Sequence, residues 1–156
     1  MTSKARELSL MKVNGIVLGF LKDGHPDMDS LKPILAAAPG TRITFHNALE
    51  RSADPLAAIK TLMSFPQINI LLVRGCGETL EERAECLGSY ANVWQKDGRR
   101  VLVNGHHVDE AVKLRELCPF IREFHLGSQV RTPEAPLPPG ALDSAKVVAA
   151  MKLLGN

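Results

Sequence analysis

The segment INILLVRGCGETLEER, residues 68–83, contains a predicted strand, a tight turn and the start of a helix in immediate succession. Ile68–Arg74 is an apolar run rich in β-branched residues, as expected for a strand that is covered on both faces. The glycines of the following GCGE sequence indicate a turn. Thr79 and Glu82 then match a capping box, which predicts a helix from this point to about Lys96. The segment therefore predicts one strand–helix unit.

The same succession of apolar strand, turn and amphipathic helix recurs along the chain. Strands that alternate with helices of this length are typical of βαβ units in a parallel sheet. We expect strands at Val13–Leu21, Thr41–Ala48, Ile68–Arg74, Arg99–Asn104 and Phe120–His125. We expect helices at Met28–Ala38, after Asp54–Pro55, at Thr79–Lys96, at Val108–Leu117 and at Leu142–Leu154. The predicted fold class is therefore α/β, with about five parallel strand–helix units.

Two architectures accommodate these units. One is a partial TIM (β/α)₈ barrel, because about 250 residues over eight units leaves about 31 residues per unit. The other is a flavodoxin-like open parallel sheet, and periodicity alone does not separate the two. Residues 1–156 are expected to form a single domain, in which the proline-rich loop TPEAPLPPG spaces the last helix. Ala5–Lys12 looks like the tail of a helix that leads into the first strand, which suggests further sequence upstream.

The composition is that of an ordinary globular domain, with 45% hydrophobic and 23% charged residues. The net charge of +2 is too small to predict electrostatic binding of nucleic acid or of an acidic membrane. No apolar run approaches the roughly 20 residues of a membrane span, and the first residues show no secretory signal. The 3 cysteines are an odd number without close pairing, which favours reduced thiols. We therefore expect a soluble cytoplasmic protein, with the nucleus as a second location.

Polar residues collect where the predicted strands end. They are His46, Arg74 to Gly77, Asn104 to His107, and Glu123 to His125. Because ligand and catalytic sites lie at the carboxyl edge of parallel sheets and barrels, we expect these side chains to gather there. Successive side chains of a strand point to opposite faces of the sheet. Glu123 and His125 are therefore expected on one face and Phe124 on the face towards the helices. In the same way, Thr44 and His46 are expected on one face and Ile43 and Phe45 on the face towards the helices. His106 and His107 are adjacent, so at most one points inward, and His25 is expected at the surface of a turn.

Metal binding is one chemistry that these residues suggest. Imidazole suits copper and zinc, and thiolate suits Cu(I), so the predicted metal ligands are Cys76, His46 and His125. The sequence contains no CxxC, HxxxH or HExxH signature, so such a site must be assembled from separate strands. Cys86 and Cys118 fall in or beside helical segments, where they are expected to be small buried hydrophobes.

Acid–base catalysis on a small anionic substrate is the second chemistry. Glu123 would then serve as base, His125 as acid and His46 as the orienting group. The anion would be held by Arg74, Ser128 or Arg131. A third interpretation is purely structural, because a histidine at the end of a strand often bonds only to nearby backbone.

Five segments, in order, resemble the copper homeostasis protein CutC family. They are VNGIVLGFLKDGHPDMDSL (13–31), RITFHNALERSADPLAAIKTL (42–62), INILLVRGCGETLEER (68–83), RRVLVNGHHV (99–108) and IREFHLGS (121–128). The most specific pieces are TFH at Thr44–His46 and EFH at Glu123–His125. TFHNALE stands here where the family has TFHRAFD, and NGHH stands where the family has a glycine-rich turn.

The resemblance implies a cytosolic (β/α)₈ barrel associated with copper. It would make Val13–Leu21 the fourth barrel strand and Phe120–His125 the eighth, and leaves the first three units without a counterpart. We therefore expect copper as the ion bound. The alternatives are a TIM-barrel enzyme with a small anionic substrate and an inactive truncated isoform. Unprotected sheet edges would favour a homo-oligomer or edge-mediated association with a partner.

Overall fold

The computed structural model describes residues 1–96, 98–105, 107–132 and 140–155. His106 and most of the proline-rich loop lie outside the described residues. The chain divides into two compact units, and each is described by itself. The first unit is Met1–Val73 with Gly88–Val101, and the second is Arg74–Leu87 with Leu102–Asn156. No helix in the described ranges is both long enough and apolar enough to cross a membrane.

The strands confirm the predicted parallel α/β fold. The strands are β1 (Gly15–Leu18), β2 (Leu21–Lys22), β3 (His25–Pro26), β4 (Arg42–Phe45), β5 (Ile68–Val73), β6 (Arg100–Gly105) and β7 (Glu123–Leu126). The helices are α1 (Thr2–Leu10), α2 (Met28–Ala37), η1 (Asn47–Arg51), α3 (Pro55–Met63), α4 (Leu80–Trp94), α5 (Val108–Leu117), η2 (Ser128–Val130) and α6 (Ser144–Leu153). The pairs β1/β4, β4/β5 and β6/β7 are parallel.

Strand order separates the two candidate architectures. The main sheet has the order β1-β4-β5-β6-β7, so each strand lies beside its predecessor in the chain once the short β2/β3 pair is set aside. A flavodoxin-like sheet would reverse direction at a switch point, with the order 2-1-3-4-5. Sequential order without reversal is the arrangement of a barrel. The flavodoxin-like alternative is therefore wrong.

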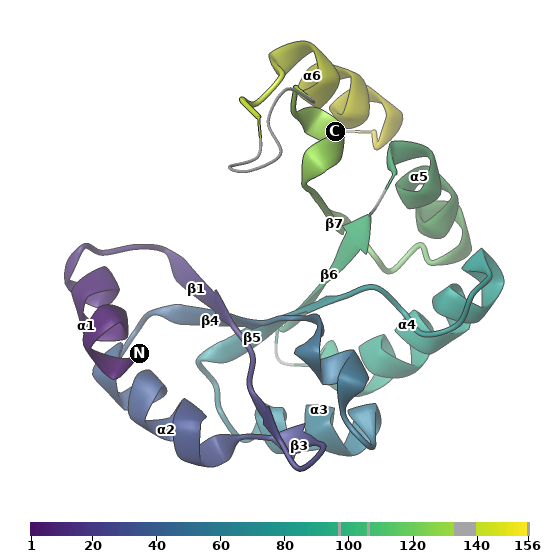
Figure 1. Ribbon diagram of the computed structural model, residues 1–156. Helices are drawn as coiled ribbons and strands as arrows, with labels where there is room; N and C mark the ends of the chain where they lie inside the picture. Colours follow the sequence, from purple (N-terminus) through teal and green to yellow (C-terminus); the bar gives the residue numbers. More distant parts are fainter. Residues whose placement is uncertain (97, 106, 133–139, 156) are drawn as a thin grey trace. The chain divides into compact units, whose positions relative to one another are not determined.

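The first unit contains β1, β4 and β5 with α1, α2 and α3 (Figure 1). Ile43 and Phe45 of β4 are fully buried, which confirms that this side of the strand faces the helices. The predicted start of α3 is confirmed, because the Asp54 carboxylate caps the helix by accepting a hydrogen bond from the backbone N–H of Ala57. Pro55 occupies the first turn of α3, where its missing N–H costs no hydrogen bond.

Two predicted strands of this unit are too long. The strand expected over Val13–Leu21 ends at Leu18, and a two-stranded antiparallel hairpin, β2/β3, follows. Its turn contains Asp23 and Gly24, both with positive φ (52° and 76°), as a two-residue hairpin loop requires. The strand expected over Thr41–Ala48 ends at Phe45, because the next residue caps η1.

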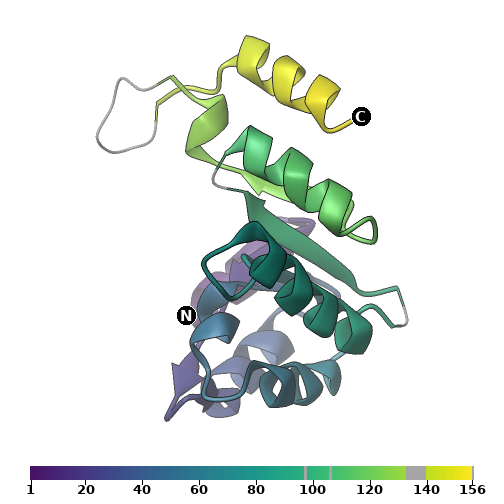
Figure 2. The same ribbon diagram turned by 90° about the vertical axis from the view of Figure 1, so that its right-hand side faces the viewer.

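The second unit contains β6 from Leu102 onwards and β7, together with α5 and α6. The helices α5 and α6 lie side by side in Figure 2. The expected helix Val108–Leu117 is found with the same bounds. The strand expected from Phe120 begins only at Glu123, because the backbone N–H of Ile121 bonds to the carbonyl of Cys118 and continues the turn after α5.

Candidate metal site

The turn after β5 packs closely against α4. Gly75 and Gly77 both have positive φ (89° and 99°), a conformation that favours glycine. A Cβ on Gly75 would lie 2.7 Å from the carbonyl oxygen of Arg83 in α4, so the close approach also requires glycine. The turn therefore returns the chain directly onto the first turns of the helix.

The predicted capping box is confirmed at the start of α4. The backbone N–H of Glu82 donates to Oγ1 of Thr79 at 3.1 Å, and the N–H of Thr79 donates to Oε2 of Glu82 at 3.1 Å. The N–H of Glu78 donates to the same carboxylate oxygen at 2.8 Å. Hydrogen bonds from the backbone of Thr79 and Glu78 lower the pKa of Glu82, because they favour its charged form.

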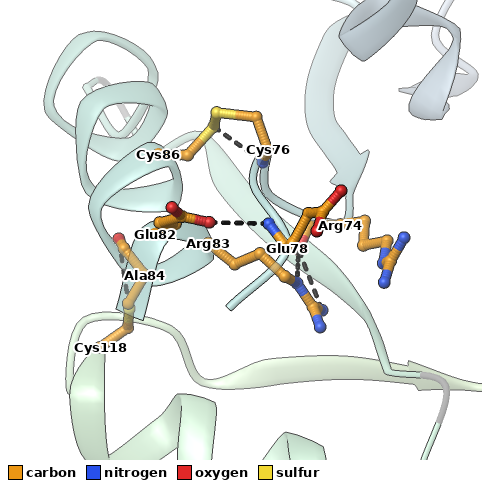
Figure 3. Close-up of a disulfide and its surroundings, with 8 residues drawn as sticks. All are labelled: Arg74, Cys76, Glu78, Glu82, Arg83, Ala84, Cys86 and Cys118. Carbon is orange, nitrogen blue, oxygen red and sulfur yellow. Dashed lines mark hydrogen bonds between the residues drawn. A yellow bond between two sulfur atoms is a disulfide. The ribbon is translucent and has the colours of Figure 1, made fainter. Parts of the chain in front are cut away.

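A disulfide joins this turn to the helix. Cys76 on the turn is bonded to Cys86 in α4, with 5.6 Å between the two Cα atoms (Figure 3). Cys76 is exposed, whereas Cys86 is 8% exposed. The backbone N–H of Cys76 also donates to Sγ of Cys86 at 2.9 Å.

The expectation of reduced thiols is wrong for this pair. The physical reason is the fold-back of the turn, which brings residues 10 apart in sequence within disulfide distance. As a disulfide, Cys76 has no thiolate to offer a metal. Cys118 is a free, buried cysteine, and burial raises the pKa of its thiol. The prediction that Cys86 and Cys118 are buried is confirmed.

Arg83 holds the turn from the helix side. It is 1% exposed, and its Nε and Nη2 both donate to the carbonyl oxygen of Arg74 at 3.2 Å. Its Nη1 forms an ion pair with Glu110 of α5. The sequence analysis missed this residue, although its helical spacing from Leu87, which is fully buried, placed it on the buried face of α4.

His46 plays a structural part in the first unit. Its Nδ1 accepts a hydrogen bond from the backbone N–H of Ala48 at 3.0 Å and so caps η1. The imidazole lies against Gly19, where a Cβ would be 2.8 Å from Nδ1. Burial, with a smaller contribution from the nearby positive charge of Arg51, lowers the pKa of His46.

The tautomer of His46 bears on its predicted role as a ligand. With Nδ1 accepting, the neutral ring carries its proton on Nε2. Coordination of a metal through Nε2 would move that proton to Nδ1, and the bond from Ala48 would be lost. A metal ion at Nε2 of His46 would therefore have to replace this capping bond.

Three residues of β7, namely Glu123, Phe124 and Leu126, line a cavity of about 440 Å³ together with residues of α6. Glu123 is half-buried and His125 is exposed.

Of the predicted anion-binding residues, Arg131 donates from Nη1 to the carbonyl oxygen of Gly140 at 3.0 Å. The other two, Arg74 and Ser128, are exposed, as are His25 and His107.

The predicted metal ligands are distributed over both units. His46 belongs to the first unit, and Cys76 and His125 belong to the second. In the part of the chain that the structure describes, no group of three or more His, Cys, Asp and Glu residues is arranged to hold a metal ion. The set Cys76, His46 and His125, and the acid–base roles of His46, Glu123 and His125, stay predictions.

Comparison with known proteins identifies the family. Residues 1–125 match the sequence model of the CutC family. The chain belongs to the CutC family. A CutC protein of Photobacterium profundum is 27% identical over 135 residues, which are 75% of this chain and 55% of that protein. The human copper homeostasis protein cutC homolog is 29% identical over 106 residues, which are 67% of this chain and 38% of that protein.

A solved CutC structure supports the fold. The crystal structure of CutC from Streptococcus agalactiae matches with a TM-score of 0.69 at 17% identity and covers 80% of this chain and 60% of that one. An identity this low supports the architecture alone. The matched part of this CutC chain spans 55% of the length of the Photobacterium profundum protein and 38% of the length of the human one.

Proposed function

We propose that this protein takes part in copper homeostasis by binding copper as its cargo. The observation that carries the proposal is the CutC family match over residues 1–125, together with the human and mouse relatives named for copper homeostasis. The chain covers 38% of the length of each of these two relatives. The donor types present, thiol sulfur and imidazole, are those that copper prefers.

The proposed form of the cargo is Cu(I). Soft sulfur ligands favour Cu(I), and reducing surroundings of the kind proposed here, the cytoplasm or the nucleus, keep copper in this state. Cys76 is the proposed sulfur ligand, and His46 and His125 are the proposed nitrogen ligands. His125 is exposed and open to an incoming ion. We also propose that the protein binds neither nucleic acid nor membranes and that it self-associates, in keeping with its net charge of +2 and its end strand β1.

Titration with a chromogenic Cu(I) chelator tests the proposal. Purified protein, reduced with a thiol-free phosphine under nitrogen, is added to a preformed Cu(I)–bathocuproine disulfonate complex. We expect the absorbance of the complex to fall as copper transfers to the protein. A parallel titration with Zn(II) and a zinc dye measures selectivity. If the reduced protein removes no copper from the weaker chelator bicinchoninate either, the proposal is wrong.

A further inference from the structure

We propose that Cys76 and Cys86, once their disulfide is reduced, form a two-thiolate site for Cu(I) at the start of α4. This inference rests on the proposed function and replaces its two imidazole ligands with a second sulfur, that of Cys86. The inference is based on the disulfide, in which the two sulfur atoms are bonded to each other between the turn after β5 and α4 (Figure 3). The pair differs from the predicted set Cys76, His46 and His125, because both sulfurs belong to the second unit.

The backbone around the pair holds without the sulfur–sulfur bond. Arg83 donates two hydrogen bonds to the carbonyl of Arg74, and the carboxylate of Glu82 accepts two from the turn that follows Cys76. None of these contacts involves sulfur. Reduction therefore leaves the two thiols facing each other across the turn, and a small rotation of the exposed Cys76 side chain admits an ion.

The surroundings favour sulfur in its thiolate form. The backbone N–H of Cys76 points at Sγ of Cys86, and such a bond stabilises negative charge on the sulfur. Cys86 is 8% exposed, so one side of the bound ion would be shielded from water and oxidants, while Cys76 leaves the other side open for transfer.

The number of ligands selects the metal. Zinc sites need four ligands, or three with an open position. The described residues contain no group of three or more His, Cys, Asp and Glu that could hold a metal. Cu(I) is a soft ion that is stable with two thiolates, so a pair of sulfurs suits it and not zinc.

The chemistry balances with a cellular thiol as the reductant. Two molecules of a monothiol such as glutathione reduce the Cys76–Cys86 disulfide to two thiols and leave as their own disulfide. One Cu(I) ion then replaces the two thiol protons, which are released to solvent, and the resulting bis-thiolate complex carries one negative charge. Formation of the disulfide removes the site, so binding follows the redox state of the pair.

Competition for Cu(I) with bicinchoninate tests the inference on the full chain. The proteins are oxidised wild type, reduced wild type, Cys76→Ser, Cys86→Ser and, as the matched control, Cys118→Ser, which removes the free buried cysteine. Circular dichroism checks the fold of each. Cys76→Ser carries the test if the buried Cys86→Ser fails to fold, because Cys76 is exposed.

We expect the reduced wild type and Cys118→Ser to bind one Cu(I) alike. Oxidised wild type, Cys76→Ser and Cys86→Ser should bind roughly tenfold or more weakly. Copper X-ray absorption should show two sulfur neighbours. If reduced wild type binds copper and Cys76→Ser binds it equally well, or if oxidation has no effect, the inference and the role of Cys76 are overturned while copper binding by the protein stands. If Cys76→Ser binds weakly but X-ray absorption shows a single sulfur neighbour, the pairing with Cys86 is overturned. If reduced wild type binds no copper, both are overturned.

Discussion

Arg83 offers the most direct test of how the turn after β5 is held. Replacement by methionine keeps an unbranched side chain that matches the aliphatic stem of arginine but removes the guanidinium. The variant loses two hydrogen bonds to the carbonyl of Arg74 and the ion pair with Glu110. Arg83 is 1% exposed, so water cannot replace these bonds without opening the structure.

The size of the effect follows from burial. Removal of one partner from a buried ion pair costs about 3–5 kcal/mol, because the other charge stays buried and unpaired. The side chain of Glu110 is 21% exposed and recovers part of its hydration. We therefore expect a loss of about 3 kcal/mol in the free energy of unfolding, the lower end of that range. For a chain of this size the melting temperature should fall by about 6–12 °C.

Urea denaturation followed by circular dichroism measures the loss. Glu110→Gln serves as the matched control for the ion pair alone. The double variant Arg83→Met/Glu110→Met removes both charges and should recover part of the loss, since an apolar pair avoids the unpaired charge. A loss below about 1 kcal/mol for Arg83→Met would refute the reasoning, because it would show that neither the carbonyl nor the carboxylate depends on this guanidinium.

Three further predictions concern the first unit. Gly19→Ala should lower stability by about 1–3 kcal/mol in urea denaturation, because its Cβ would meet the ring of His46 at 2.8 Å; unchanged stability would contradict the close packing. Burial, aided by the charge of Glu50, raises the pKa of Tyr90 to about 12, above its ordinary value of 10.0. Its neutral form is thus favoured in the folded state, so the contribution of Tyr90 to stability should be constant below pH 10 and be lost as the pH rises from 10 to 12. Tyr90→Phe should show a shallower fall in alkaline denaturation, and an identical curve would count against this cause. Val17 is 60% exposed on the end strand β1, and Val17→Lys should reduce self-association in sedimentation velocity; equal association of both proteins would place the contact elsewhere.

The sequence predicted the alternation of strands and helices because apolar periodicity and helix caps are local signals. The capping box at Thr79 and Glu82 and the helix that begins at Pro55 are examples. Strand ends were less predictable, since they depend on bonds that periodicity does not encode. The strand before His46 ends where that side chain turns back to cap η1. Strand order, which distinguished the barrel from the open sheet, is a property of pairing between distant segments.

The candidate site was predicted in part. The sequence placed polar residues at strand ends, and alternation correctly predicted the buried side of β4, with Ile43 and Phe45. The Cys76–Cys86 bond was missed, because the fold-back that brings the two residues together depends on the positive φ of Gly75 and Gly77. Three cysteines allow three pairings, and spacing alone does not choose among them. Arg83 was missed because a charged residue on a predicted helix is normally assigned to the solvent side.

The Cys76–Cys86 disulfide is the oxidised form of the two cysteines, whereas the proposed cytoplasmic location favours their reduced form. Disulfides persist in oxidising surroundings, whereas cytoplasmic thiols are kept reduced. The turn can keep its structure in both the oxidised and the reduced form if contacts other than the Cys76–Cys86 bond hold it. The contacts of Glu82 and Arg83 with the turn backbone use only nitrogen and oxygen, and they are independent of the redox state of sulfur. A turn anchored in this way keeps two thiols together after reduction, which is the condition that a Cu(I) site made of only two ligands requires.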